Sequence, residues 1–146
     1  MARRTFFSFE YGDVSRAMVV RNSWVTQERI ARGFIDAAEL EKLKRVGDDA
    51  VKRWINSQMD NTTVTVVLVG GSTCQSRWVK YEIDRSKALG HGLIGINISE
   101  IKDLFGKTSS LCGKIPAGYS FYNWFGDSGY RNMGTWIEQA AIAAGK

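Results

Sequence analysis

The sequence contains little of what marks several common classes of protein. Among its 146 residues are two cysteines, one proline and one histidine. Two cysteines without a paired spacing indicate neither a disulfide framework nor a zinc site, so we expect Cys74 and Cys112 to be inert small residues in a reducing cytoplasm. The single His91 lies between two glycines with no acidic or nucleophilic motif beside it, and we predict no metal site.

Hydrophobic runs long enough to cross a bilayer are also missing. A spanning helix needs roughly 20 apolar residues, and no stretch approaches that length. The first residues, Met1 to Phe7, lead directly into strand-like sequence without the apolar region and cleavage site of a signal peptide. We therefore predict a cytoplasmic protein without a membrane partner.

Basic residues outnumber acidic ones, but they form no concentrated patch. The formal net charge is +5, which raises the question of a nucleic-acid partner. Two arginines begin the chain and a small basic cluster falls within residues 42–45, whereas the other cations are interleaved with acids. No basic helix or recognised nucleic-acid motif is present, so a nucleic-acid partner is disfavoured. A mildly basic surface equally suits a phosphorylated small molecule.

What the chain does contain is the composition of a globular protein. It is 44% hydrophobic, 12% aromatic and 24% charged, which argues against disorder. Its length suits one domain with a substantial core and is too short for two typical domains. We predict a single domain over residues 1–146.

Strand-like and helix-like patterns alternate along the chain. We expect strands at residues 5–9, 32–36, 63–69 and 93–98, and helices with apolar stripes within 17–24, 51–59, 77–89 and 133–144. The charged stretch 37–45 is predicted to be a loop with a helical turn, 99–118 to be irregular, and the aromatic segment 121–125 to be mainly core. The alternation is typical of an open α/β fold with a mostly parallel central sheet.

Folds of this kind bind ligands outside the carboxyl ends of their strands. Those ends carry Ser8, Phe9 and Tyr11 after the first expected strand, Ser72 after the third and Asn97 in the fourth. We expect Asp36 to end the second strand and not to bind a ligand. The chain has neither a GxGxxG nor a GxxxxGK[ST] motif, so a Rossmann dehydrogenase and a P-loop NTPase are disfavoured.

One carboxylate lies on the apolar face of the third expected helix. Residues three, four and seven positions apart share a face of an α-helix. This spacing places Glu82 in the middle of a stripe formed by Trp78, Val79, Ile83, Ser86 and Leu89. A carboxylate there costs free energy unless it is paired or lines a cavity. The helix alone leaves two interpretations open: a structural glutamate paired with a neighbouring cation, or a functional carboxylate at the rim of a cleft.

Four segments, in this order along the chain, resemble those of a TIR domain. They are Phe6 to Phe9 at the end of the first strand, Phe34 to Asp36 at the end of the second, Ser72 after the third, and Trp78 to Ile83. The last segment resembles the W-x-x-x-E-[IL] signature of NAD-cleaving TIR domains, whose glutamate is essential for that activity. More narrowly, residues 20–24, 122–124 and 127–130 together with Trp136 resemble the TIR-like subunit of bacterial Thoeris anti-phage systems.

The resemblance implies a flavodoxin-like, three-layer α/β sandwich that cleaves the bond joining nicotinamide to ribose in NAD. Glu82 would be the catalytic carboxylate, and no cofactor beyond the NAD substrate would be needed. It further implies that an ADP-ribose-derived signal, a cyclic isomer in many relatives, activates a separate effector protein. A phage-derived trigger would start the reaction, with self-association on activation, since many TIR domains complete their site only on assembly.

The same resemblance suggests substrate-binding residues. Ser8 and Phe9 fall where TIR domains line the substrate crevice, and Phe9 or Tyr11 could stack on a base. Trp78 is expected to pack beside the pocket and shape it, and Ser72 and Asn97 are further candidates. For Ser8 and Phe9 an ordinary structural role stays open. Many relatives carry basic residues after the first strand, whereas this chain has Glu10 and Tyr11, so the groups that contact the phosphates are left open.

Two other functions compete with the enzyme. A non-catalytic TIR adaptor acts by head-to-tail association, but it has no need of a glutamate on the apolar face of this helix. A nucleotide-binding regulator of the response-regulator type needs an acidic pair for magnesium, and the first strand ends without one at Ser8-Phe-Glu10. We therefore favour the enzyme.

Overall fold

A five-stranded parallel sheet forms the centre of the protein. The computed structural model describes residues 3–25 and 31–146. Within these ranges the strands lie in the order β2-β1-β3-β4-β5, which is that of a flavodoxin-like fold. The strands are β1 Thr5–Ser8, β2 Ala31–Arg32, β3 Val64–Val69, β4 Gly92–Asn97 and β5 Ser120–Asn123. The predicted α/β class is confirmed, and every described pairing is parallel.

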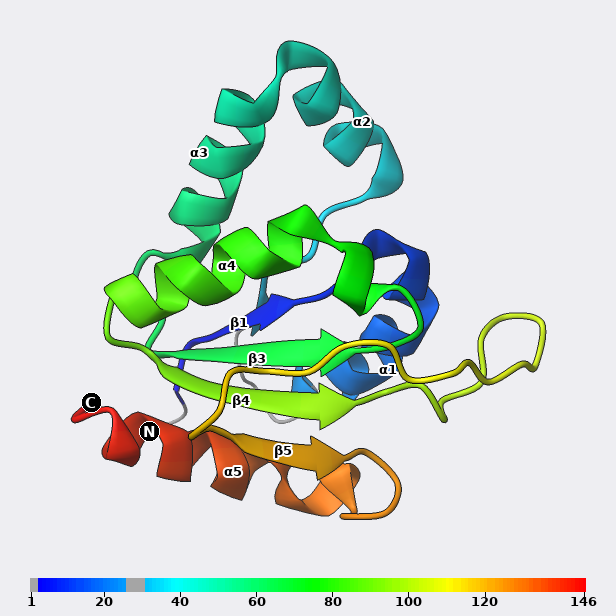
Figure 1. Cartoon of the computed structure of the whole chain (residues 1–146), viewed down its shortest axis with the longest axis vertical. Coiled ribbons are helices and arrows are strands. Elements are labelled where there is room, and N and C mark those ends of the chain that lie inside the picture. Colours follow the sequence, from blue (N-terminus) through cyan, green and yellow to red (C-terminus); the bar gives the residue numbers. More distant parts are fainter. Residues whose placement is uncertain (1–2, 26–30) are drawn as a thin grey trace.

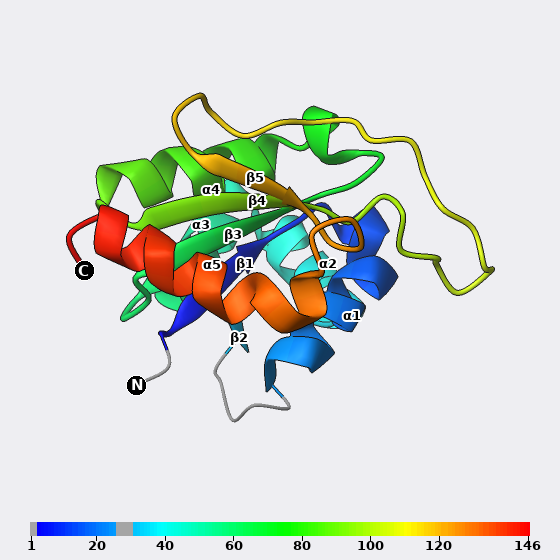
Figure 2. The ribbon, with the colours of Figure 1, turned by 90° about the horizontal axis from the view of Figure 1, so that it is seen from below.

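Helices cover both faces of this sheet, giving three layers. They are α1 Val14–Val25, α2 Ala37–Val46, α3 Asp48–Met59, α4 Arg77–Ala88 and α5 Gly129–Ala143. Figure 1 shows α4 on one face with the α2–α3 pair beyond it, and α5 on the opposite face. Figure 2, seen from below, shows α1 and α5 together in front of the strands.

The central strands β3 and β4 are buried and largely apolar on both sides. Every residue of β3 is buried, and so are the residues of β4 up to Ile96. A central parallel strand is covered on both faces and therefore needs no polar face. The largest core cluster lies between the sheet and the α1–α5 layer, where Phe7 and Trp24 pack together with Ile137. The clear β-branched pattern of residues 63–69 thus predicted the strand on which the sheet is built.

The segment between β2 and α3 differs from the sequence expectation. Residues 37–45, predicted to be a loop with a helical turn, belong to the full helix α2, and Asp36 caps it by accepting a 2.9 Å hydrogen bond from the backbone N–H of Glu39. The second strand is shorter than predicted and ends at Arg32. The next residue, Gly33, has φ +93°, a left-handed conformation that turns the chain out of the sheet.

The aromatic segment 121–125 contributes a strand that the sequence analysis did not predict. Residues Ser120–Asn123 form β5 at the edge of the sheet, where Tyr122 stacks on Trp136 with ring centres 4.0 Å apart. Trp124 is buried, but Phe121 and Phe125 are exposed. The expectation of a mainly core segment is therefore wrong for Phe121 and Phe125, because β5 lies at the edge of the sheet and none of its residues is buried.

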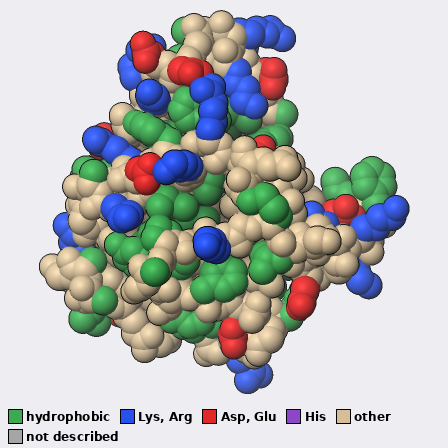
Figure 3. Space-filling view, viewed as in Figure 1, with side chains coloured by type: hydrophobic (Ala, Val, Ile, Leu, Met, Phe, Trp, Pro, Cys, Tyr) green, Lys and Arg blue, Asp and Glu red, His purple; other side chains and the backbone are tan. Residues whose placement is uncertain are grey.

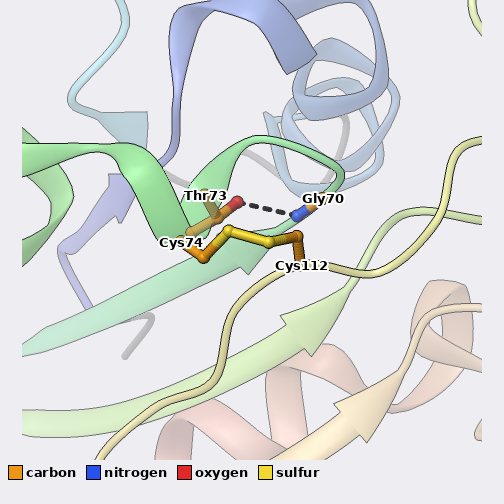
Figure 4. The surroundings of a disulfide bond; sticks show 4 residues. All are labelled: Gly70, Thr73, Cys74 and Cys112. Atoms are coloured by element: carbon orange, nitrogen blue, oxygen red, sulfur yellow. Dashed lines mark hydrogen bonds between the residues drawn. A yellow bond between two sulfur atoms is a disulfide. The ribbon is translucent and has the colours of Figure 1, made fainter.

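Cys74 and Cys112 form a disulfide, contrary to the expectation that they are inert thiols (Figure 4). Their Cα atoms lie 5.3 Å apart although the residues are 38 positions apart in sequence. The backbone N–H of Cys74 donates to the carbonyl of Cys112, and the N–H of Cys112 donates to the carbonyl of Gly70, both at 2.9 Å. The irregular segment 99–118 is thereby fastened beside the end of β3.

Across the described residues, no helix combines the length and apolarity needed to cross a membrane.

Candidate active site

Glu82 lies on the buried face of α4. The hydroxyl of Ser76 caps this helix by accepting a hydrogen bond of 3.2 Å from the backbone N–H of Val79. The helix then turns Val79, Glu82 and Ser86 toward the sheet, and only 7% of Glu82 is exposed. Leu89, which the stripe had placed on the same face, is exposed because the helix ends at Ala88. The carboxylate is therefore held inside the protein, not at its surface.

Ser8, the last residue of β1, is the hydrogen-bonding partner of this carboxyl group. Its side chain is fully buried, and its hydroxyl donates to Oε1 of Glu82 at 2.7 Å. Because β1 lies next to β3 and α4 packs over both, the carboxyl end of β1 meets the middle of α4. The two candidates come together from positions 74 apart in sequence.

The surroundings strongly favour the neutral form of Glu82. Burial raises its pKa from 4.5 to about 8. The Ser8 hydrogen bond opposes this effect by stabilising the carboxylate, and the negative charge of Glu10 adds to it. Near neutral pH the unliganded carboxyl group is mostly protonated, and a cation placed beside it would favour ionisation.

A small cavity of about 70 Å³ adjoins Glu82, and we call it the Glu82 recess. Its lining comprises Phe7, Phe9, Glu10, Tyr11, Gly33, Ile35, Leu40, Lys44, Val51, Trp54, Ile55, Ser76, Trp78 and Glu82. The predicted residues Phe9, Tyr11 and Trp78 thus share one cavity with the carboxylate. Phe9 packs against Phe34 at 5.0 Å between ring centres, so it also contributes to the core.

Trp78 links the recess to the surface of α4. Its ring lies beside that of Tyr81, with ring centres 6.0 Å apart, and the guanidinium of Arg77 lies 4.6 Å from its ring centre. It packs on the cluster formed by α3 and Phe6. Trp78 thus forms part of the wall of the recess.

Two predicted residues lie away from the recess. Ser72 is exposed in the turn after β3. Asn97 lies at the end of β4, where its amide nitrogen donates to Oδ1 of Asn123 at 3.0 Å. Its own Oδ1 accepts from the backbone N–H and the hydroxyl of Ser99, so its side chain is engaged within the sheet edge.

Several residues of the recess were not proposed from the sequence. Lys44 and Leu40 come from α2, where the sequence predicts a loop with a helical turn, and Trp54 comes from the apolar stripe of α3. A signal for α2 was present, since Asp36 followed by Glu39 has the spacing of a capping box. Among the described residues, no group of three or more His, Cys, Asp or Glu side chains could hold a metal ion.

Two comparisons with known proteins show what the chain is similar to. A family model described as "Thoeris protein ThsB, TIR-like domain" matches residues 6–103, a range that contains both Ser8 and Glu82. The chain is also 43% identical over 139 residues to a protein of Bacillus cereus (strain MSX-D12) named "Putative cyclic ADP-D-ribose synthase ThsB1". That alignment covers 93% of this chain and 72% of the Bacillus protein.

Proposed function

This chain belongs to the family of Thoeris ThsB proteins with a TIR-like domain, and from that premise we propose that it is an enzyme acting on NAD. It cleaves the bond between nicotinamide and ribose and converts the remainder into a signal derived from ADP-ribose, a cyclic isomer. The signal activates a separate effector protein. The observation that carries the proposal is the buried Glu82, hydrogen-bonded to Ser8 beside an aromatic recess.

The chemistry needs one well-placed negative charge. Nicotinamide in NAD is already cationic, so it leaves with the electron pair of the broken carbon–nitrogen bond and needs no proton. The ribose carbon left behind has oxocarbenium character, as in glycoside cleavage. A carboxylate beside it stabilises that charge, and the stabilisation is stronger where water is excluded. Glu82 is buried and lines the recess, which supports this role, and a cationic substrate beside it would favour its ionised form.

The fate of the ribose carbon depends on what reaches it next. Attack by an atom of the same molecule gives a cyclic product, whereas attack by water gives linear ADP-ribose. The recess is small and lined by Phe9, Tyr11, Trp54 and Trp78, which leaves little room for water. This lining supports the cyclic product, and hydrolysis is the side reaction.

Assembly and triggering form part of the same proposal. A cavity of about 70 Å³ is far below the roughly 300–1,000 Å³ of ordinary ligand sites. The recess must therefore widen before the nicotinamide end of a dinucleotide enters it. We propose that a phage-derived trigger, acting with self-association of the protein, brings about this opening.

The test is incubation of NAD with wild-type protein and with Glu82→Gln, in extracts of phage-infected and of uninfected cells, followed by mass spectrometry. Wild-type protein in infected extract should release nicotinamide and an ADP-ribose species, and Glu82→Gln should release neither. Turnover by Glu82→Gln at the wild-type rate would remove Glu82 from the mechanism. A wild-type protein that leaves NAD intact under both conditions would favour the adaptor that acts by TIR–TIR association.

A further inference from the structure

The Glu82 recess continues into a larger groove. This outer groove has a volume of about 450 Å³ and is lined by Glu10, Lys44, Asp48, Val51, Gln75, Ser76, Arg77 and Trp78. Five of these residues, Glu10, Lys44, Val51, Ser76 and Trp78, also line the recess. Recess and groove are therefore adjoining parts of one crevice, with the carboxylate at the inner part.

The outer groove carries two cations and two anions, but only one pair is joined. Arg77 donates to both carboxylate oxygens of Asp48, at 3.0 Å and 2.6 Å, so their charges offset one another. Within residues 3–25 and 31–146, the side chains of Lys44 and Glu10 make no hydrogen bond or ion pair. Two opposite charges thus line the same crevice without pairing.

The position of each free charge suggests what it faces. Glu10 lines both the recess and the groove, and its negative charge raises the pKa of Glu82. Lys44 lies on α2, four residues after Leu40, and both line the recess. Figure 3 shows cationic and anionic side chains side by side over the α2–α3 end of the molecule. A lysine that borders both parts of the crevice can reach a ligand that spans them.

A dinucleotide such as NAD carries the complementary charges. Its nicotinamide end is cationic and its diphosphate is anionic, and the two groups are separated by one ribose. We infer that Lys44 binds the diphosphate in the outer groove, while Glu10 faces the cationic nicotinamide riboside held at Glu82. Since this assignment concerns the same crevice, it rests on the proposed function.

Lys44 is the better phosphate ligand of the two cations because Arg77 is already held by Asp48. A lysine ammonium binds phosphate as a point charge, and it needs no second fixed contact. The loop after β1 offers Glu10 and Tyr11 and no cation. The positive charge for the phosphates therefore comes from Lys44 of α2.

Titration calorimetry with ADP tests this inference without any catalytic step, because ADP has the diphosphate and lacks nicotinamide. The proteins are wild type, Lys44→Ala and the matched control Lys42→Ala, whose lysine lies on the same helix, is exposed and faces Glu39. A hydrogen bond to a charged group contributes about 1.5–3 kcal/mol, so Lys44→Ala should weaken ADP binding about tenfold or more. Lys42→Ala should bind as the wild type does. Raising the salt concentration should weaken binding to the wild type more than to Lys44→Ala.

Three results would each overturn the inference. They are an ADP affinity of Lys44→Ala equal to that of the wild type, a weakening by Lys42→Ala as large as that by Lys44→Ala, and no ADP binding to the wild type at millimolar concentration. NAD turnover separates it from the proposed function. For Lys44→Ala we expect a raised KM for NAD with kcat largely kept. If NAD cleavage requires Glu82 but is unaffected by Lys44→Ala, the inference about Lys44 is wrong and the proposed function stands. If ADP binding depends on Lys44 but the protein never cleaves NAD, the proposed function is wrong and the assignment of Lys44 as a phosphate ligand stands.

Discussion

The hydroxyl of Ser8 donates a hydrogen bond of 2.7 Å to Oε1 of Glu82, and both side chains are buried. The bond joins the end of β1 to the middle of α4 and gives the carboxyl group its one hydrogen-bonding partner among the described side chains. A donor of this kind stabilises the carboxylate relative to the acid. Ser8 therefore partly offsets the effect of burial on Glu82.

Replacing Ser8 by alanine should move the pH dependence of the reaction upward. The hydrogen bond lowers the pKa of Glu82 against the effect of burial, so its loss raises that pKa above about 8. If the carboxylate is the active form, kcat/KM of the wild type rises with pH toward about 8, and that of Ser8→Ala rises at higher pH. The measurement is a pH profile of kcat/KM for NAD, with Ser57→Ala, an exposed serine of α3, as the control. Identical profiles for Ser8→Ala and wild type would contradict the assignment.

Replacing Glu10 by glutamine should move the same profile downward. The negative charge of Glu10 raises the pKa of Glu82, and the neutral amide removes that repulsion. The rise in kcat/KM should then occur at lower pH than in the wild type. Glu41→Gln, an exposed residue of α2 outside the crevice, should leave the profile unchanged. An upward shift in Glu10→Gln would show that Glu10 acts on Glu82 in some other way.

Glu82→Gln should make the protein more stable at alkaline pH. The pKa of Glu82 is 4.5 in its reference state and about 8 in the folded protein. The folded state therefore binds the proton of Glu82 more tightly than the unfolded state does. The stability that this proton contributes is complete below about pH 4.5 and is lost as pH rises through about 8. Glutamine offers an amide oxygen that can accept the hydrogen bond from Ser8, and its side chain does not ionise. We expect a gain over wild type approaching about 4 kcal/mol near pH 9 and almost none near pH 4.

Urea unfolding at these two pH values measures the difference. Glu100→Gln, at an exposed position after β4, serves as the control and should give the same free energy of unfolding as the wild type at both. A stabilisation by Glu82→Gln that does not change with pH would contradict the raised pKa.

Reduction of the Cys74–Cys112 disulfide should destabilise the protein. A cross-link between residues 38 positions apart restricts the unfolded chain, and for a loop of this size the effect is about 3–4 kcal/mol. Unfolding with and without a reducing agent measures the loss, which the double variant Cys74→Ser/Cys112→Ser should reproduce. The reducing agent should have no further effect on that variant. Equal stability of the oxidised and reduced wild type would mean that segment 99–118 is held by its other contacts.

Two serines near the start of α4 should differ in their effect on stability. Ser76 caps α4 through the backbone N–H of Val79, so Ser76→Ala should cost about 1 kcal/mol. Ser72 is exposed, lies outside the recess and makes no side-chain cap, so Ser72→Ala should change neither stability nor NAD turnover. Chemical denaturation together with the NAD assay measures both. Loss of NAD turnover in Ser72→Ala would show that Ser72 does contribute to the substrate site.

The parts of the fold that the sequence predicted are those in which one element carries its own pattern. Residues 63–69 are β-branched and apolar, and they form β3. Residues 77–89 have a helical stripe, and they form α4 with Glu82 on the buried face. Helix α2 and strand β2 were harder to predict, because α2 buries none of its residues and β2 has only two residues. The two residues of β2 are too few to show a period, and the charged residues 37–45 resemble a solvated loop although the Asp36 and Glu39 capping signal is present.

The sequence by itself determined the parallel α/β fold and the position of a carboxylate on the inner face of a helix, because both follow from patterns that repeat over a few residues. Only the tertiary structure decided that Ser8 meets Glu82, that Cys74 bonds Cys112 and that Lys44 borders the same crevice. Those pairs are distant in the chain. Their proximity results from how the layers pack, and no local pattern of side chains encodes the distance between two elements.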